Sequence, residues 1–126
     1  MKHLVLFIFI FLAGSAALHA QSITSDQTGE NGIRKIEVTP DDAVCSIKIE
    51  IELKGDEIQS VVYTRGCNGN TKGIGALIKG MKIDDAIERL DGITCGKKTT
   101  SCPDQLAKAL RIIKDQEAQQ QSEPLR

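Results

Sequence analysis

The strongest constraint on the fold is the segment VCSIKIEIEL, residues 44–53, in which apolar and polar side chains alternate. One parity carries the apolar side chains of Ile47, Ile49, Ile51 and Leu53. A period of two residues predicts a half-buried β-strand with one face in water. Cys45 shares the parity of the isoleucines, so we expect its side chain on the buried face.

A second strand is expected at 58–65, IQSVVYTR, because the turn-forming residues 54–57 separate it from the first. A two-residue turn would join the two strands as a hairpin and place Cys45 opposite Gly66, beside Cys67. The hairpin therefore predicts that two cysteines meet at its open end.

Other segments complete the predicted fold. Residues 33–38, IRKIEV, alternate weakly and are expected to form a short strand. Apolar spacing predicts helices at 70–81, 82–90 and 103–118, with a loop before the last of them. We therefore expect an α+β fold, in which about three helices cover a small antiparallel sheet of about three strands.

Residues 1–20 are typical of an export leader, with a short basic start and an apolar run from Leu4 to Ala13. This run is shorter than the roughly 20 apolar residues that span a membrane, and small residues precede Ala20. We expect a signal peptide and an exported protein, periplasmic or secreted, without membrane contact after cleavage; an uncleaved anchor is the alternative. The remaining chain is divided into a polar linker with a short first strand at 21–39, a domain at 40–118 and a flexible tail at 119–126.

Composition excludes several classes of function. The two histidines, His3 and His19, lie in the expected leader, so the processed chain would contain none. That excludes a Ser-His-Asp triad, a Cys-His dyad and a zinc site that needs imidazole. The aromatic content of 3% and the formal net charge of −1 argue against direct binding of nucleic acid.

Four cysteines carry the candidate chemistry: Cys45, Cys67, Cys95 and Cys102. A metal site of four thiolates, zinc or iron–sulfur, would use all of them and need no histidine. Two disulfides, most easily 45–67 and 95–102, suit an exported chain, and composition favours them slightly. A thiol catalyst with Cys102 as nucleophile would have no histidine base, and we rank it last.

The position of Cys102 before Pro103 suggests why a sulfur would be placed there. Proline prefers the first position of a helix, so we expect Cys102 to be the N-cap of the last helix. The helix dipole and the unpaired N–H groups stabilise a thiolate at that end. Ser101 and Asp104 are expected to support the cap with hydrogen bonds.

Several stretches closely resemble the TSCPD domain family over about residues 40–113: GCNGNTKGI, ALIKGM, AIERLDGI followed by CG, and TSCPDQLAKAL. The resemblance implies that the four cysteines bind a metal. Four thiolates in an exported chain favour zinc over an iron–sulfur cluster. The same domain resembles a C-terminal segment of adenosylcobalamin-dependent (class II) ribonucleotide reductases. The chain is too short for the catalytic barrel of such an enzyme, so the resemblance implies an accessory module that is not catalytic alone. Adenosylcobalamin is implied as a cofactor only by this family association.

The order of the elements is also similar to NifU-type iron–sulfur scaffolds, whose three cluster cysteines would correspond to Cys45, Cys67 and Cys102. Two further interpretations of the function stay open. The chain could be a component of a ribonucleoside-diphosphate reductase that acts in deoxyribonucleotide and DNA synthesis, with that reductase as its partner. It could instead be an exported, disulfide-stapled module that binds a protein partner.

Overall fold

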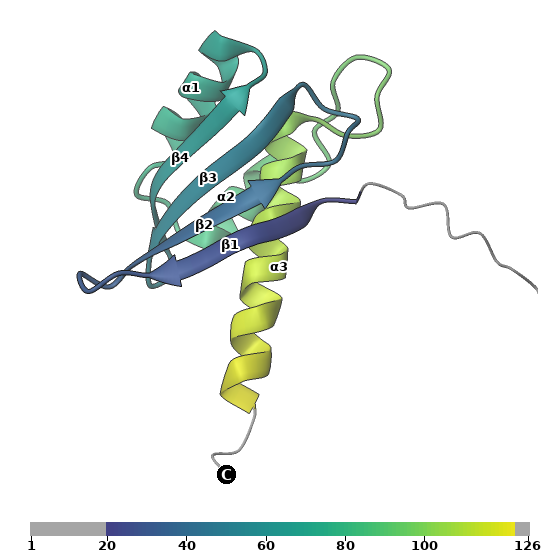
Figure 1. The fold of residues 1–126 in the computed structure, drawn as a ribbon. Helices are drawn as coiled ribbons and strands as arrows, with labels where there is room; N and C mark the ends of the chain where they lie inside the picture. The colour runs from purple at the N-terminus through teal and green to yellow at the C-terminus, as the bar shows by residue number, and fades with distance from the viewer. Residues whose placement is uncertain (1–19, 123–126) are drawn as a thin grey trace, which may run out of the picture.

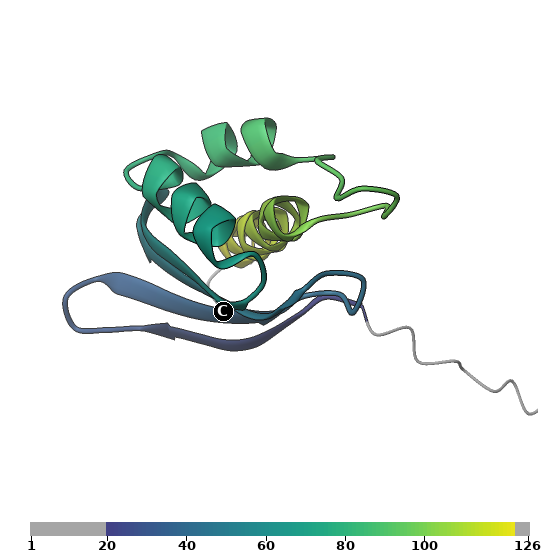
Figure 2. The ribbon, with the colours of Figure 1, turned by 90° about the horizontal axis from the view of Figure 1, so that it is seen from above.

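The computed structural model describes residues 20–122, and the expected signal peptide lies outside these residues apart from Ala20. The elements in chain order are β1 (Ser22–Thr28), β2 (Ile33–Thr39), β3 (Ser46–Lys54), β4 (Glu57–Arg65), α1 (Asn68–Ile78), α2 (Ile83–Leu90) and α3 (Cys102–Ser122). The strands form one antiparallel sheet in the order β1-β2-β3-β4. The three helices lie on one face of this sheet (Figures 1 and 2). The predicted α+β class is confirmed.

The hairpin of β3 and β4 is close to its predicted form. Lys54 pairs with Glu57, which leaves a two-residue turn. Gly55, the first residue of the turn, has a φ of 58°, a conformation that glycine adopts without strain. At the open end Ser46 pairs with Arg65, as the predicted register requires. The hairpin thus brings the chain around Cys45 close to the end of β4.

The alternation along β3 breaks at its first residues. Ile49, Ile51 and Leu53 are buried as predicted, but Ile47 is 52% exposed and Ser46 only 3% exposed. The pairing with β4 shifts by one residue between Ser46 and Lys48. Such a bulge reverses the parity of the residues that precede it. The prediction of a buried Ile47 was therefore wrong, and Cys45 is exposed as well.

The sheet has one strand more than expected, because residues 22–28 form β1 rather than a linker. This strand pairs with β2 along the edge of the sheet, and the Arg34 guanidinium binds both carboxylate oxygens of Asp26 at 2.7 and 2.6 Å. Only Ile23 of β1 packs against the core. A polar edge strand of this kind lacks the apolar alternation from which a strand is predicted.

The core lies between the sheet and the helices. It is formed by apolar residues of β2, β3 and β4 on one side and by residues of α2 and α3 on the other, among them Ile36, Ile51, Ile58, Ala86, Leu106 and Leu110. The three predicted helices are present within a few residues of their expected bounds. The helix α3 continues through residues 119–122, which were expected to belong to a flexible tail. No helix within residues 20–122 is long and apolar enough to cross a membrane.

The helix α1 lies against β4 at close range. A Cβ atom added at Gly75 would lie 2.5 Å from the carbonyl oxygen of Val61, a distance that real Cβ contacts do not show. Glycine at this position therefore allows the helix to approach the strand. The approach fixes the start of α1, and with it Cys67, beside the end of the hairpin.

Candidate cysteine site

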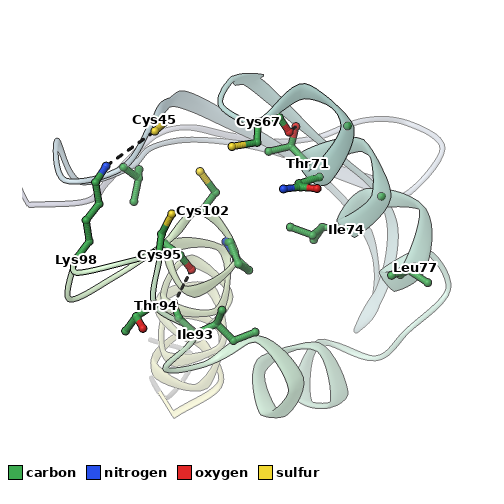
Figure 3. Close-up of a pocket in the computed structure, with 16 residues that line it drawn as sticks. Cys45, Cys67, Thr71, Ile74, Leu77, Ile93, Thr94, Cys95, Lys98 and Cys102 are labelled. Atoms are coloured by element: carbon green, nitrogen blue, oxygen red, sulfur yellow. Dashed lines mark hydrogen bonds between the residues drawn. The ribbon is translucent and has the colours of Figure 1, made fainter.

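All four cysteines line one cavity of about 520 Å³ (Figure 3). Cys45 precedes β3, Cys67 precedes α1, Cys95 lies in the loop before α3, and Cys102 is the first residue of α3. These positions are separated by up to 57 residues in the sequence. The fold therefore gathers the four candidate cysteines, which come from four separate segments, at one place.

The four thiols are all free, so neither of the two disulfides that the sequence allowed is formed. Cys45, Cys67 and Cys95 are exposed, whereas Cys102 is partly buried. Within residues 20–122, no group of three or more Cys, His, Asp or Glu side chains is arranged so that it could hold a metal ion. The sulfurs thus share a cavity in this structure without forming a coordination sphere.

The corner between β4 and α1 brings Cys67 beside Cys102. Arg65 has a φ of 63° and Gly66 a φ of 97°, so two consecutive residues adopt the left-handed region. A Cβ atom at Gly66 would lie 3.7 Å from the sulfur of Cys102 and 3.2 Å from Cγ2 of Thr71. The absence of a side chain at Gly66 therefore leaves room for the Cys102 sulfur next to this corner. A non-glycine residue with positive φ is uncommon and often marks a functional turn.

The helix α3 is capped one residue earlier than the sequence predicted. The Ser101 carbonyl oxygen accepts the first helical hydrogen bond from the Gln105 N–H at 2.9 Å. The Ser101 hydroxyl accepts a hydrogen bond from the Asp104 N–H at 3.3 Å. Ser101 is therefore the N-cap, because a hydroxyl accepts hydrogen bonds better than a thiol does. Cys102 and Pro103 occupy the first two helical positions instead, and the thiol stays at the positive end of the helix.

Asp104 holds both ends of the loop at 91–101. Its buried carboxylate accepts hydrogen bonds from the Gly92 N–H at 2.8 Å and from the Thr100 hydroxyl at 2.5 Å. The Lys108 ammonium lies 2.7 Å from the same carboxylate. Burial raises the pKa of Asp104, but the contacts with Lys108, Thr100 and Gly92 outweigh it and hold the pKa below its usual value. The sequence predicts Asp104 only as cap support, because its role in anchoring the loop has no signal in the sequence.

The middle of this loop carries Cys95 and is exposed at residues 91–99. The Cys95 N–H donates to the Thr100 carbonyl oxygen at 3.3 Å, and the Ser101 hydroxyl donates to the Ile93 carbonyl oxygen at 2.5 Å. The Lys98 ammonium lies 3.9 Å from the sulfur of Cys45, across the mouth of the cavity (Figure 3). A cationic side chain therefore contacts one of the candidate ligands.

Two further polar side chains lie near Cys102. The Tyr63 hydroxyl donates to the Cys102 carbonyl oxygen at 3.2 Å. Burial, reinforced by the nearby Cys102, raises the pKa of Tyr63, so the phenol stays a neutral donor. The Ser46 hydroxyl is buried without a hydrogen-bond partner in the described part of the chain. An unsatisfied buried hydroxyl costs about 1–3 kcal/mol.

The cavity has a second, apolar end. Figure 3 shows the sulfurs gathered on one side and Ile74, Leu77 and Ile93 on the other. Leu77 is 75% exposed and Ile93 42% exposed. Gly69 and Gly73 of α1 also line the cavity, and a Cβ atom at either would meet nothing within 4 Å. A glycine inside a helix costs about 1 kcal/mol relative to alanine, and neither turn geometry nor packing requires glycine at these two positions.

Comparison with known proteins identifies a family. The model of a family described as the TSCPD domain matches residues 23–114. The matched region includes all four cysteines and most of every helix and strand from β1 to α3. No curated protein and no solved structure matches the chain.

Proposed function

Because this chain belongs to the TSCPD domain family, we propose that it is a metal-binding module of that family, with zinc as the metal. The proposed ligands are Cys45, Cys67, Cys95 and Cys102. The observation that carries the proposal is that four free thiols from four separate segments line one cavity. Thiolates are the preferred ligands of structural zinc, and four of them complete its tetrahedral coordination.

Four thiolates suit zinc as ligands, but the sulfurs are not arranged around a common centre in this structure. Cys67 and Cys102 are held at the starts of two helices, beside Gly66. Cys95 lies in the exposed part of the 91–101 loop, and Cys45 precedes β3 outside regular structure. We infer that zinc binding requires these two cysteines to approach the other two. Binding would then cross-link the hairpin end, the start of α1 and the start of α3.

A site with four thiolate ligands leaves no open position on zinc, and closed sites are structural rather than catalytic. We therefore propose an accessory role without a reaction of its own. The family resemblance links this role to ribonucleotide reductases, and we propose such an enzyme as the candidate partner. Adenosylcobalamin has no role in this proposal.

The proposed location is outside the cytoplasm, on the basis of the leader-like residues 1–20. Oxidising compartments favour disulfides, so zinc competes there with oxidation of the same thiols. An iron–sulfur cluster is the second metal candidate, because it uses the same four-thiolate ligand set.

The test is a titration of the reduced, metal-free protein with Zn²⁺ in competition with a chromophoric chelator. We expect one equivalent to bind, and Co²⁺ in its place to give the visible absorption of tetrahedral thiolate coordination. Serine at any one of the four cysteine positions should weaken zinc binding on the order of 100-fold or more, because loss of even an outer-shell partner costs 10–100-fold. Thr94→Ser is the matched control, since Thr94 lines the cavity beside Cys95 without offering a thiol. Failure of the reduced protein to bind stoichiometric zinc, or serine variants that bind like the parent, would overturn the proposal.

A further inference from the structure

We propose that the apolar end of the cysteine-lined cavity binds a small amphipathic anion, a carboxylate that carries an alkyl chain of medium length. The alkyl chain would lie along α1, and the carboxylate would face Lys98 at the mouth of the cavity. This site adjoins the proposed metal site, because Lys98 lies 3.9 Å from the Cys45 sulfur, whereas the alkyl chain would lie in the part of the cavity that the sulfurs do not occupy.

The cavity is larger than a metal ion requires, and part of its lining is apolar. A volume of about 520 Å³ is within the range of pockets that hold small organic molecules. Ile74, Leu77 and Ile93 form its apolar end, opposite the sulfurs in Figure 3. Leu77 and Ile93 are large apolar residues that the fold leaves exposed. These side chains favour an apolar ligand, because binding would remove both the ligand and the side chains from water.

The helix α1 presents bare backbone to this cavity at Gly69 and Gly73. These glycines are four residues apart, so they lie on the same face of the helix. Neither has a positive φ, and a side chain at either would extend into open space. Glycine at both positions therefore has no role in the fold that the structure shows. It does let a ligand pass close to the helix, which a side chain would prevent.

The charges around the cavity identify the headgroup. Among the residues that line the cavity, Lys98 carries the one charged side chain, and none is acidic. In addition, the α1 helix has no acidic residue in its first turn and no side-chain cap, so its N-terminal N–H groups add positive potential. An anionic headgroup complements this surface, whereas a cationic one would be repelled.

The test uses the full reduced chain with metal removed by chelation, so that its outcome does not depend on zinc. Isothermal titration calorimetry at low salt would compare sodium decanoate, sodium octanoate and decyltrimethylammonium chloride. We expect decanoate to bind at one site per chain. Octanoate should bind about 15-fold more weakly, because two fewer methylene groups are buried. Decyltrimethylammonium has the opposite charge and an alkyl chain that is longer by one carbon, and we expect its affinity to be lower by at least about tenfold.

Variants locate the site. Gly73→Leu places a side chain inside the cavity and should lower decanoate affinity by at least about tenfold, with an unchanged or higher melting temperature. Ala76→Leu is the matched control, because Ala76 is an exposed α1 residue that does not line this cavity. Lys98→Gln should weaken decanoate binding about fivefold, whereas Lys54→Gln at the remote hairpin turn should not.

Three results would each overturn the proposal. The first is that decanoate does not bind. The second is that decanoate and decyltrimethylammonium bind equally well. The third is that Gly73→Leu, shown to be folded by circular dichroism, binds decanoate as the parent chain does.

Discussion

Asp104 gives the sharpest test of how the cysteine loop is held in place. Its carboxylate joins the first turn of α3 to both ends of the 91–101 loop, through the Gly92 N–H and the Thr100 hydroxyl. The perturbation is Asp104→Ala, which removes both acceptors and the ion pair with Lys108. Asp104→Asn is the matched variant, because it keeps the size of the side chain, removes the charge and replaces one of the two acceptor oxygens with an amide donor.

The expected cost follows from these contacts. A hydrogen bond to a charged group contributes about 1.5–3 kcal/mol, and a donor left buried without an acceptor costs about as much. The Lys108 side chain is 44% exposed, so its ion pair adds little. We expect Asp104→Ala to lower the free energy of unfolding by about 3 kcal/mol, and Asp104→Asn to lower it by about half as much. For a domain of this size, 3 kcal/mol corresponds to a fall of about 15 °C in the melting temperature.

The pH dependence has a definite sign. The pKa of Asp104 is lower in the folded protein than in the unfolded chain, where it is about 3.9. The carboxylate therefore contributes stability that is fully present above about pH 5 and is lost as pH falls through the folded pKa. Asp104→Asn lacks this contribution, so the difference in stability between parent and variant should shrink in acid.

The assay is urea unfolding followed by circular dichroism, for the parent and both variants at pH 7 and at steps down to pH 3. A loss below about 0.5 kcal/mol for Asp104→Ala would refute the reasoning, because surface substitutions have effects of that size. A difference between the parent and Asp104→Asn that grows in acid would refute the assigned direction of the pKa shift.

Four further substitutions test the glycines and the buried hydroxyl, each by urea or thermal unfolding. Gly75→Ala should lower the free energy of unfolding by about 2–3 kcal/mol, because the added methyl group would meet the Val61 carbonyl oxygen. Gly73→Ala in the same helix should raise it by up to about 1 kcal/mol. Equal effects of the two substitutions would contradict the packing described for α1. Gly66→Ala should lower the free energy of unfolding by about 1–3 kcal/mol, because a residue with a side chain is strained at a φ of 97°. An unchanged free energy of unfolding would argue against that backbone conformation. Ser46→Ala should leave stability unchanged or raise it by about 1 kcal/mol, and a clear loss would mean that the hydroxyl has a partner in solution.

The sequence predicted the parts of the fold that depend on apolar periodicity. The alternation at Ile49, Ile51 and Leu53 and the helical spacing before and after the 91–101 loop both describe buried faces, which is why these elements are present as expected. Two features without such a pattern were missed. The edge strand β1 is held by pairing with β2 rather than by burial. The bulge at Ser46 depends on local backbone geometry, so a strict parity count placed Ile47 on the wrong face.

The sequence predicted which residues form the candidate site, but not the cavity beside them or how the loop is held. The cysteines were selected because no other residue type in the chain offered comparable chemistry, and hairpin geometry placed Cys45 near Cys67. The cavity beside them arises from the spacing between α1 and the loop, which no local pattern specifies. The anchoring by Asp104 likewise depends on a contact between residues 12 positions apart, Gly92 and Asp104, across a loop.

Native mass spectrometry of the processed protein from its own cells would show whether the four cysteines bind one metal ion. The same sample would be measured under denaturing conditions. We expect an adduct of one zinc ion that disappears on denaturation and leaves four free thiols. A native mass without metal, together with a denatured mass lighter by four hydrogens, would mean two disulfides and would contradict metal binding by these cysteines.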